Sequence, residues 1–541
     1  MNTILPKILD ELRLIVGENN IKIDSDLIAN YSRSTLSQGT IPAAIVLPEN
    51  KEEIVSLLKV AEKYKLHIHP ISTGKNWGYS DACAPTDGQI ILNLERMNKI
   101  IEVNSDLGYA TIEPGVTQGQ LYTFLMENNI PLWMDATGAG MNTSIIGNVL
   151  ERGFGHSPYG DRYAHSSGYE IVLPTGEILN TGFGHYKNSK VTEIYKWGVG
   201  PAVDGLFTQS NLGIVTKMTL WLLPKPEKFK ILFFSLKEES DITEFIEKVR
   251  PLKMDGTLKS VIHINNDLRM ISTSQRFPFE EVNSNTHLPK NIRLELTKKN
   301  NLGFWSGTAG FYGSHKQVHA DIAKVKKVFH NYKGFKIFIF IDSYSLFFFE
   351  KALSLTKNFY TSKTTLPPLY KKMKIAFDLL QGKSPESSIL GGLWKTRLSK
   401  EESKLLTKDP LDYQSGFYWI SPLLPMKGAE VTLLNRLIEP IFNKYGFDML
   451  QTVSMVNERT LCAVLTICFS KKDKEESLKA ETCHNEVVQS LIDNGYIIYR
   501  SGNQSMKLLY EDNDTYTQFI KKIKKTIDPF GIISPGRYIP E

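Results

Sequence analysis

We predict an α+β fold from three observations. Short apolar strands are mixed with helices as far as Leu223, without the regular βαβα order of a doubly wound sheet. The run Leu223-Pro224-Lys225-Pro226 then interrupts the pattern and indicates a domain boundary. Beyond it, apolar strands separated by long helices indicate a sheet covered by helices, and therefore a second α+β domain.

The first domain contains a βαβ unit that runs into a glycine-rich turn. An apolar run at 43–48, an amphipathic helix at 51–64 and a second strand at 67–71 make up this unit. The remaining elements that we expect here are strands at 89–92, 108–112, 169–173 and 214–222, with a helix at 120–126.

In the second domain, longer helices separate the expected strands. Its expected strands are 231–236, 261–265, 335–341 and 461–469, and its long helices are 429–445 and 475–494. The aromatic run 344–349 is interpreted as buried core or as a contact between protein copies rather than as a cofactor site. A homodimer is compatible with this interpretation.

Composition and charge narrow the class of protein. The 541 residues include 64 basic and 58 acidic side chains, and the basic run 521–525 fits the solvated face of a C-terminal helix, so nucleic-acid binding is not implied. The four cysteines lack metal-ligand spacing and indicate reduced, mostly buried thiols without a structural zinc. No stretch approaches the ~20 apolar residues that span a bilayer, so we expect no membrane contact and a cytoplasmic location.

Four segments are unusually rich in glycine and small residues. They are the turn 70–79, the segment 113–116, the loop 135–148 and the segment 151–161. Closely spaced glycines let backbone N–H groups approach a planar or phosphorylated ligand, and Lys75 would add positive charge in the first turn. The GxGxxG turn of a dinucleotide-binding βαβ unit is absent. Any dinucleotide must therefore be bound by a different fold.

The order of the motifs is specific. STGKNWGYS is followed by IEPGVT, a Gly/Ser loop with IGN, ERGFGHSPYGD, YEIVLPTGEILNTG and FTQSNLGIVTKMTLWLLP. SGFYWISPL, GYIIYRSGNQSM and DPFGIISPGRYIP come later in the chain. Taken together, the sequence resembles the vanillyl-alcohol oxidase and p-cresol methylhydroxylase family of FAD-dependent oxidoreductases over most of its length.

This resemblance implies an architecture and a cofactor. An FAD-binding domain of two α+β subdomains would span 1–225 and be completed by about 500–541, and an α+β cap domain over the substrate would span 226–499. The residues that the resemblance assigns to FAD are Ser72, Thr73, Gly74, Lys75, Asn76, Pro114, Gly115, Gly138, Ser144, Gly147, Asn148, Gly153, Gly155, Tyr159, Gly213, Ile214, Val215 and Arg537.

The resemblance also assigns a catalytic set. Tyr79, Tyr499 and Arg500 match the trio that binds a phenolic oxygen as phenolate, and Asp161 matches an acid–base residue near flavin N5. A guanidinium and two phenol donors stabilise an oxyanion, which favours hydride loss from the benzylic carbon and formation of a p-quinone methide that water can attack. His156 and His165 flank Asp161, and each is either an auxiliary base or a structural histidine.

The sequence departs from the family where relatives attach their flavin covalently. Phe417 stands where relatives carry a linking His, and Trp77 occupies the other attachment position, so we expect non-covalent FAD. Tyr413 remains a candidate for an aryl-ether link. The electron acceptor is either dioxygen or a separate c-type cytochrome, since this chain has no haem-binding CxxCH.

The expected activity is oxidation of a para-substituted phenol, such as a 4-alkylphenol, a 4-hydroxybenzyl alcohol or a related phenolic intermediate. Two alternatives stay open. One is an FAD-dependent dehydrogenase of a 2-hydroxy acid or a sugar on the same fold. The other is a flavin-binding protein whose redox chemistry is vestigial.

Overall fold

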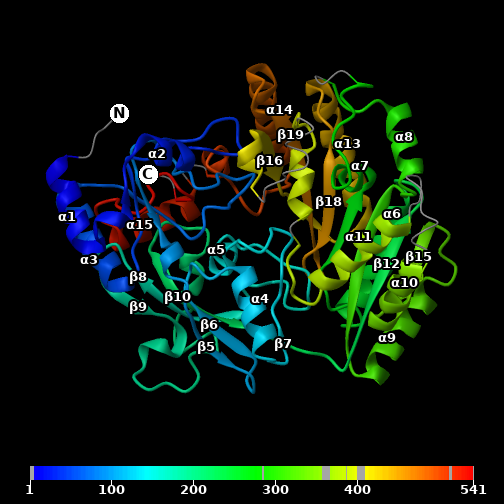
Figure 1. Cartoon of the computed structure of the whole chain (residues 1–541), viewed down its shortest axis with the longest axis horizontal. Coiled ribbons are helices and arrows are strands. Elements are labelled where there is room, and N and C mark those ends of the chain that lie inside the picture. The colour runs from blue at the N-terminus through cyan, green and yellow to red at the C-terminus, as the bar shows by residue number, and fades with distance from the viewer. Residues whose placement is uncertain are drawn as a thin grey trace.

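The computed structural model shows two lobes side by side, with the N-terminal strands in one and the middle of the chain in the other (Figure 1). It describes residues 5–282, 286–355, 366–385, 387–398, 409–510 and 514–539. Helices and sheets are mixed in both lobes, which confirms the predicted α+β class. In these ranges no helix is both long and apolar enough to cross a membrane.

The first lobe begins with a four-stranded sheet in the order β1-β2-β4-β3. Strands β2 and β3 lie parallel to β4, and β1 is antiparallel to β2. Its elements are α1 (Pro6–Val16), β1 (Ile21–Lys22), α2 (Ser25–Tyr31), β2 (Ala44–Val46), α3 (Lys51–Tyr64), β3 (Ile68–Ile71) and β4 (Ile90–Asn93). Helix α3 begins after Asn50, whose side chain accepts from Glu53 N, and it buries Ile54, Leu57, Leu58 and Ala61 at helical spacing.

A five-stranded antiparallel sheet follows, in the order β5-β6-β10-β8-β9. Its strands are β5 (Ile100–Asn104), β6 (Tyr109–Ile112), β8 (Ser166–Val172), β9 (Ile178–Asn180) and β10 (Ile214–Trp221). Helices α4 (Gln118–Glu127) and α5 (Ile145–Leu150) pack against this sheet in one apolar cluster. The short strands β7 (Leu132–Trp133) and β11 (Leu223–Pro224) pair at the end of this segment.

The C-terminus returns to this first lobe. Helix α15 (Thr515–Ile527) packs Ile520, Ile523 and Ile527 against the core of the five-stranded sheet. Lys522 and Lys525 are exposed, as the basic run predicts. Lys524 differs, because its Nζ turns inward and donates to Asn211 O at 2.7 Å.

The second lobe is built on one eight-stranded antiparallel sheet, which we call the cap sheet. Its order is β15-β12-β14-β13-β18-β19-β16, and β17 pairs with β19. The strands are β12 (Lys228–Leu236), β13 (Ile262–Asn266), β14 (Trp305–Gly313), β15 (Phe335–Ile341), β16 (Ser415–Ile420), β17 (Leu423–Pro425), β18 (Leu450–Met455) and β19 (Thr460–Ser470).

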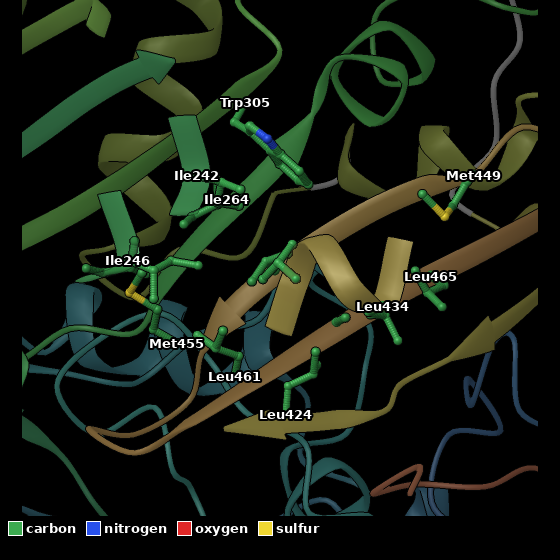
Figure 2. Packing of buried hydrophobic residues seen from close by; sticks show 14 of the residues in the cluster. Ile242, Ile246, Ile264, Trp305, Leu424, Leu434, Met449, Met455, Leu461 and Leu465 are labelled. Carbon is green, nitrogen blue, oxygen red and sulfur yellow. The ribbon is translucent and has the colours of Figure 1, made fainter. Parts of the chain in front are cut away.

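Long helices cover one face of the cap sheet. They are α6 (Asp241–Met254), α9 (His315–Val328), α13 (Gly428–Tyr445) and α14 (Lys474–Asp493). Ile264, Met455 and Leu465 belong to the apolar core beneath these helices, and Figure 2 shows Leu465 beside Leu434 of α13. The smaller helices are α7 (Asp267–Ser272), α8 (Lys290–Lys299), α10 (Ser343–Leu355) and α11 (Leu366–Leu379).

The opposite face of the cap sheet has a different composition. Side chains alternate between faces along each strand, so the cross-strand neighbours His263, Ser454 and Cys462 share the face away from the long helices. Phe417 and Cys468 form another pair on this face. The polar and aromatic face is therefore turned toward the first lobe.

Several sequence predictions need correction. The periodicity analysis missed β14, β16 and β18, because strands rich in glycine, aromatic and hydroxyl side chains lack a simple apolar run. The aromatic run 344–349 forms part of helix α10, whose Tyr344, Phe347 and Phe348 are 69%, 49% and 66% exposed. The buried-core interpretation is wrong for these three, and a contact between protein copies stays a prediction. The four cysteines are free and buried, as predicted.

Candidate active site

Tyr79, Tyr499 and Arg500 come together between the two lobes. Tyr79 follows the turn after β3, and its hydroxyl is 2.8 Å from Ser421 Oγ. Tyr499 N donates to Ser421 O at 3.1 Å, which joins the segment after α14 to the cap sheet. The Arg500 guanidinium carbon lies 4.4 Å from the centre of the Tyr79 ring. Residues far apart in sequence thus form one buried cluster.

A largely buried carboxylate, that of Glu151, holds this arginine in place. Glu151 Oε2 lies 3.6 Å from Arg500 Nε, and Glu151 Oε1 forms an ion pair with Arg537. Tyr538 donates its hydroxyl hydrogen to Glu151 Oε2 at 2.5 Å. Arg500 also donates to Asn76 Oδ1, while its Nε is buried without a hydrogen-bond partner among the described residues. We call Glu151, Arg500, Arg537 and Tyr538 the ionic cluster.

The electrostatics of this region suit an anion. Burial raises the pKa of Tyr79 to about 12, and burial also raises the pKa of Tyr499 well above its usual value. Burial opposes the charge on Arg500, but Glu151 raises the pKa of its guanidinium above the usual value. Both tyrosines therefore stay neutral donors at neutral pH, and the two guanidinium groups exceed the one carboxylate by one positive charge.

Two histidines lie beside this cluster. His263 forms contacts at both ring nitrogens, with Nδ1 2.8 Å from Ser454 Oγ and Nε2 3.1 Å from Gly155 O. Because a carbonyl only accepts, Nε2 carries the hydrogen and Nδ1 accepts from Ser454. The His156 ring lies 4.0 Å from the His263 ring, centre to centre, and Phe154 links this pair to Tyr499 at 5.7 Å.

The pKa of each histidine favours the neutral form. Burial lowers the pKa of His263 to about 4. Burial, then His263 and Arg162, lower the pKa of His156 well below its usual value. The ring nitrogens of His156 form no hydrogen bond within the described part of the chain. His156 is therefore a neutral imidazole with a nitrogen available to accept a proton.

The glycine-rich segments assigned to FAD meet in the first lobe. Ser144 N donates to the Thr73 hydroxyl at 3.2 Å, and Ser144 Oγ donates to Pro114 O at 2.7 Å. A Cβ at Gly147 would lie 3.3 Å from Ser72 Oγ, and a Cβ at Gly115 would lie 2.6 Å from Glu95 O. Three segments distant in sequence therefore pack closely together, and larger side chains at the two glycines would separate them.

This region has features that fit a bound cofactor. Gly74 and Gly78 adopt φ angles of +67° and +74°, which turn the 72–79 backbone sharply. Trp77 Nε1 is buried without a hydrogen-bond partner among the described residues, and Lys75 Nζ lies 5.8 Å from the centre of the Trp77 ring. An unpaired donor and a cation beside a glycine turn match the acceptors of a dinucleotide.

Other residues assigned to FAD have structural roles. A Cβ at Gly155 would collide with Asp135, and a Cβ at Gly153 would collide with Asn148. Asn148 Oδ1 accepts from Arg162 Nη1 at 3.1 Å. The remaining assigned residues are Gly138, in the partly buried loop; Gly213, whose Cβ would collide with Ile171; Ile214 and Val215, whose side chains are buried in two apolar cores; Tyr159, which stacks on His165; and Arg537, in the ionic cluster.

Asp161 is not brought into the cluster. Its side chain is exposed, and its carboxylate accepts from Ala164 N at 3.1 Å to close a turn. The groups that feel its charge include Tyr163 and Lys196. His165 likewise lies on this side, with Nδ1 2.8 Å from Asp161 O. The buried carboxylate of Asp135 instead pairs with Arg162 Nε at 2.8 Å.

Sequence reasoning missed three of the residues that shape the site. Glu151 lies within the ERGFG motif but was given no role, and no local pattern reveals that its partner is Arg537. His263 and Ser454 lie on β13 and β18, and only their cross-strand pairing brings them together. An unexplained charged residue inside a glycine-rich motif was the one signal available in the sequence.

The fold and this site define a class, the flavin-dependent oxidoreductases. A family model described as an FAD binding domain matches residues 42–182. The chain is 30% identical to 1'-carboxy-chondrochloren decarboxylase of Chondromyces crocatus, with 99% of this chain and 97% of that protein covered. It is 28% identical to the 4-cresol dehydrogenase [hydroxylating] flavoprotein subunit of Pseudomonas putida, with coverage of 98% and 95%.

The solved structures agree. The crystal structure of p-cresol methylhydroxylase with substrate bound superposes with a TM-score of 0.86 at 28% identity, covering 98% of this chain and 96% of that one. This protein belongs to the vanillyl-alcohol oxidase and p-cresol methylhydroxylase family, and it is an FAD-dependent oxidoreductase.

Proposed function

We propose that this enzyme oxidises a para-substituted phenol at the benzylic carbon. The observation that carries the proposal is the buried surplus of one positive charge beside two neutral phenol donors, Tyr79 and Tyr499. A phenolate would neutralise that charge and accept from both tyrosines and from Arg500. A neutral sugar would leave the charge uncompensated, which disfavours that alternative.

The protein side of the chemistry follows from these residues. Arg500, held by Glu151, stabilises the phenolate oxygen, and this promotes electron release toward the para carbon. Bound FAD supplies a two-electron acceptor for a hydride from the benzylic carbon. The turn 72–79, with Trp77 Nε1, and the loop 138–148 would hold that cofactor.

We assign proton transfer to His156. Its ring nitrogens form no hydrogen bond among the described residues, so one of them is free to accept the phenolic proton or a proton from attacking water. His263, fixed by Ser454 and Gly155, orients its neighbour. This role is the one that the resemblance assigned to Asp161, whose exposed position supports a turn-closing function instead.

The flavin is proposed to be non-covalent. The resemblance puts Phe417 at the sequence position of the linking histidine, and a phenyl ring cannot form that bond. Its ring is buried, with Cδ2 3.3 Å from the place of a Cβ at Gly78, which supports the proposal. Acid precipitation tests this point. Yellow colour in the supernatant is expected, and colour in the pellet would direct attention to Tyr413, which lies at the end of a short 3₁₀ turn at Pro410–Tyr413.

A substrate panel tests the proposed function. The purified enzyme is mixed anaerobically with 4-ethylphenol, 4-hydroxybenzyl alcohol, lactate and glucose, and flavin bleaching is recorded. We expect bleaching with the phenols only. The name of the decarboxylase relative indicates a substrate with a carboxyl group, so carboxylated phenols belong in the panel. Bleaching by lactate or glucose alone would overturn the proposal.

A variant gives the matched control. Tyr499→Phe removes one donor to the phenolate and is expected to slow flavin reduction about 10²-fold, with no change in FAD content. Tyr496→Phe removes a hydroxyl nearby in sequence, which donates to Glu430 outside the cluster, and should leave the rate unchanged. Equal rates for Tyr499→Phe and the parent enzyme would refute the assignment.

The electron acceptor is identified by a separate experiment. Dioxygen and cytochrome c are added separately to the reduced enzyme, and the one that reoxidises the flavin is the acceptor.

A further inference from the structure

A second buried cation lies on the polar face of the cap, outside the ionic cluster. Arg269 belongs to α7, and its Nη1 is buried without a hydrogen-bond partner within the described ranges. This nitrogen lies beside Gly391, where a Cβ would come within 2.5 Å of it. Gly391 O in turn accepts from Cys468 Sγ at 3.6 Å. A buried guanidinium nitrogen without a protein acceptor requires a partner, which an anionic ligand, an ion or a water can supply.

A neighbouring arginine adds to the charge. Arg276 donates from Nη1 to Leu390 O at 2.6 Å, so both arginines reach the short 3₁₀ segment Ser387–Leu393. Burial lowers the pKa of Arg276 to about 10 and also lowers the pKa of Arg269. Cys468 is the group that raises the pKa of Arg269 and of Arg276, in opposition to burial. Burial also raises the pKa of the Cys468 thiol to about 12, so this thiol stays protonated and neutral.

The acidic groups of this region are already engaged. Asp267 on the same helix forms an ion pair with Arg293 Nη2 at 2.5 Å. Asp448 accepts from Trp394 Nε1 at 2.8 Å and from Leu288 N at 2.7 Å. Neither arginine forms an ion pair with a described carboxylate, and a buried cation without such a partner is able to bind an anion.

An aromatic wall connects this charge to the phenolate site. Phe417 pairs across the sheet with Cys468, and it also lies against Gly392, next to the glycine that contacts Arg269. The Phe417 ring lies 5.6 Å from Trp419, which lies 5.7 Å from Tyr79. From Phe417 to Ser421, whose hydroxyl contacts Tyr79, the extended chain spans about 13 Å at the usual rise of a strand.

We propose that Arg269, supported by Arg276, forms a subsite for the carboxylate of a phenolic substrate whose para side chain ends in an acid. This inference rests on the proposed function, because the phenolate at Arg500 sets the other end of the ligand. The aromatic wall between the two cations would contact the ring and the short side chain. The substrate class is thus a 4-hydroxyphenyl carboxylic acid rather than a simple alkylphenol.

Calorimetric binding to the holoenzyme tests the subsite with a matched pair of ligands. The ligands are 3-(4-hydroxyphenyl)propanoate and 4-propylphenol, which differ in the charged end. For Arg269→Gln we expect the Kd of the acid to rise about 10- to 100-fold, the loss of a charged hydrogen bond, while the Kd of 4-propylphenol stays the same. Arg269→Lys should recover part of the affinity for the acid.

Control measurements distinguish a carboxylate subsite from a cofactor contact and from a general disturbance of the cap. Arg250→Gln removes an arginine from α6, on the helix-covered side of the cap sheet, and should change neither Kd. A fall in bound FAD in Arg269→Gln would show that the arginine holds a cofactor phosphate and would overturn the subsite, as would equal weakening of both ligands. A parent enzyme that binds 4-propylphenol without preferring the acid overturns this inference alone. One that binds neither phenol overturns the proposed function with it.

Discussion

Two buried clusters on opposite sides of the cap sheet are stabilised by different forces. The apolar core beneath α13 and α14 contains Leu434 and Leu465, both fully buried, and gains from removing apolar surface from water at roughly 25 cal/mol per Å². The ionic cluster buries Arg500, Arg537 and Glu151, whose desolvation roughly cancels their attraction. The first cluster holds the lobe together, and the second is better accounted for by ligand binding than by stability.

Removing the carboxylate of the ionic cluster should have the largest effect. Glu151→Gln leaves Arg500 and Arg537 without their counter-ion, and we expect a loss of about 3–5 kcal/mol in the free energy of unfolding at neutral pH. Urea denaturation measures this loss. A loss in the free energy of unfolding below about 0.5 kcal/mol, the effect of a typical surface substitution, would show that the cluster needs no carboxylate.

The same variant has a defined pH dependence. Burial raises the pKa of Glu151, but Arg537 and Arg500 together lower it by more than burial raises it. The folded-state pKa therefore lies below the usual value of 4.5. The stability that Glu151 contributes is complete above that usual value and is lost as the pH falls through the lower folded-state pKa. The difference between parent and variant should therefore narrow in acid.

The apolar cluster is tested by Leu465→Ala. The cavity that it leaves beside Leu434 should cost about 2–5 kcal/mol of stability, with flavin reduction by a phenol unchanged once the protein is folded. Thermal and urea unfolding give the first quantity, and anaerobic stopped-flow gives the second. A slower reduction at unchanged stability would mean that the two sides of the sheet are not independent.

His156→Phe tests the proton acceptor. A ring of similar shape without nitrogen should lower the rate of flavin reduction about 10²-fold and leave stability nearly unchanged. His165→Phe, which changes the histidine that contacts Asp161 O, should not slow the reaction. If only the His165 variant were slow, the proton acceptor would have to be sought beside Asp161.

The smallest effect is expected for Ser454→Ala. It removes the hydrogen bond to His263 Nδ1, which we expect to cost about 1 kcal/mol of stability. Because the imidazole then loses its fixed orientation, the pH dependence of flavin reduction should shift while FAD content stays constant. Thr452→Val is the matched control. Thr452 lies on β18, as Ser454 does, and its hydroxyl donates to Asn265 Oδ1 on β13.

Sequence alone determined much of the fold and part of the site. Local periodicity placed α3 at its observed bounds and α13 within one residue, because helix formation depends on nearby residues. The glycine turns and the motif order indicated FAD, and the same motifs singled out Tyr79, Tyr499 and Arg500. The helix predictions rest on neighbouring residues, whereas FAD and the catalytic residues rest on the resemblance of the ordered motifs to the family.

Tertiary structure decided the rest. Strand pairing brings His263 to Ser454, and the C-terminal return brings Arg537 to Glu151 across 386 positions. The Asp161 carboxylate is exposed and accepts from Ala164 N, because the direction of a side chain depends on the turn that carries it, and its catalytic assignment stays a prediction. The unpaired Arg269 is likewise invisible in sequence, because burial and the absence of a counter-ion among the described residues are properties of the packed chain.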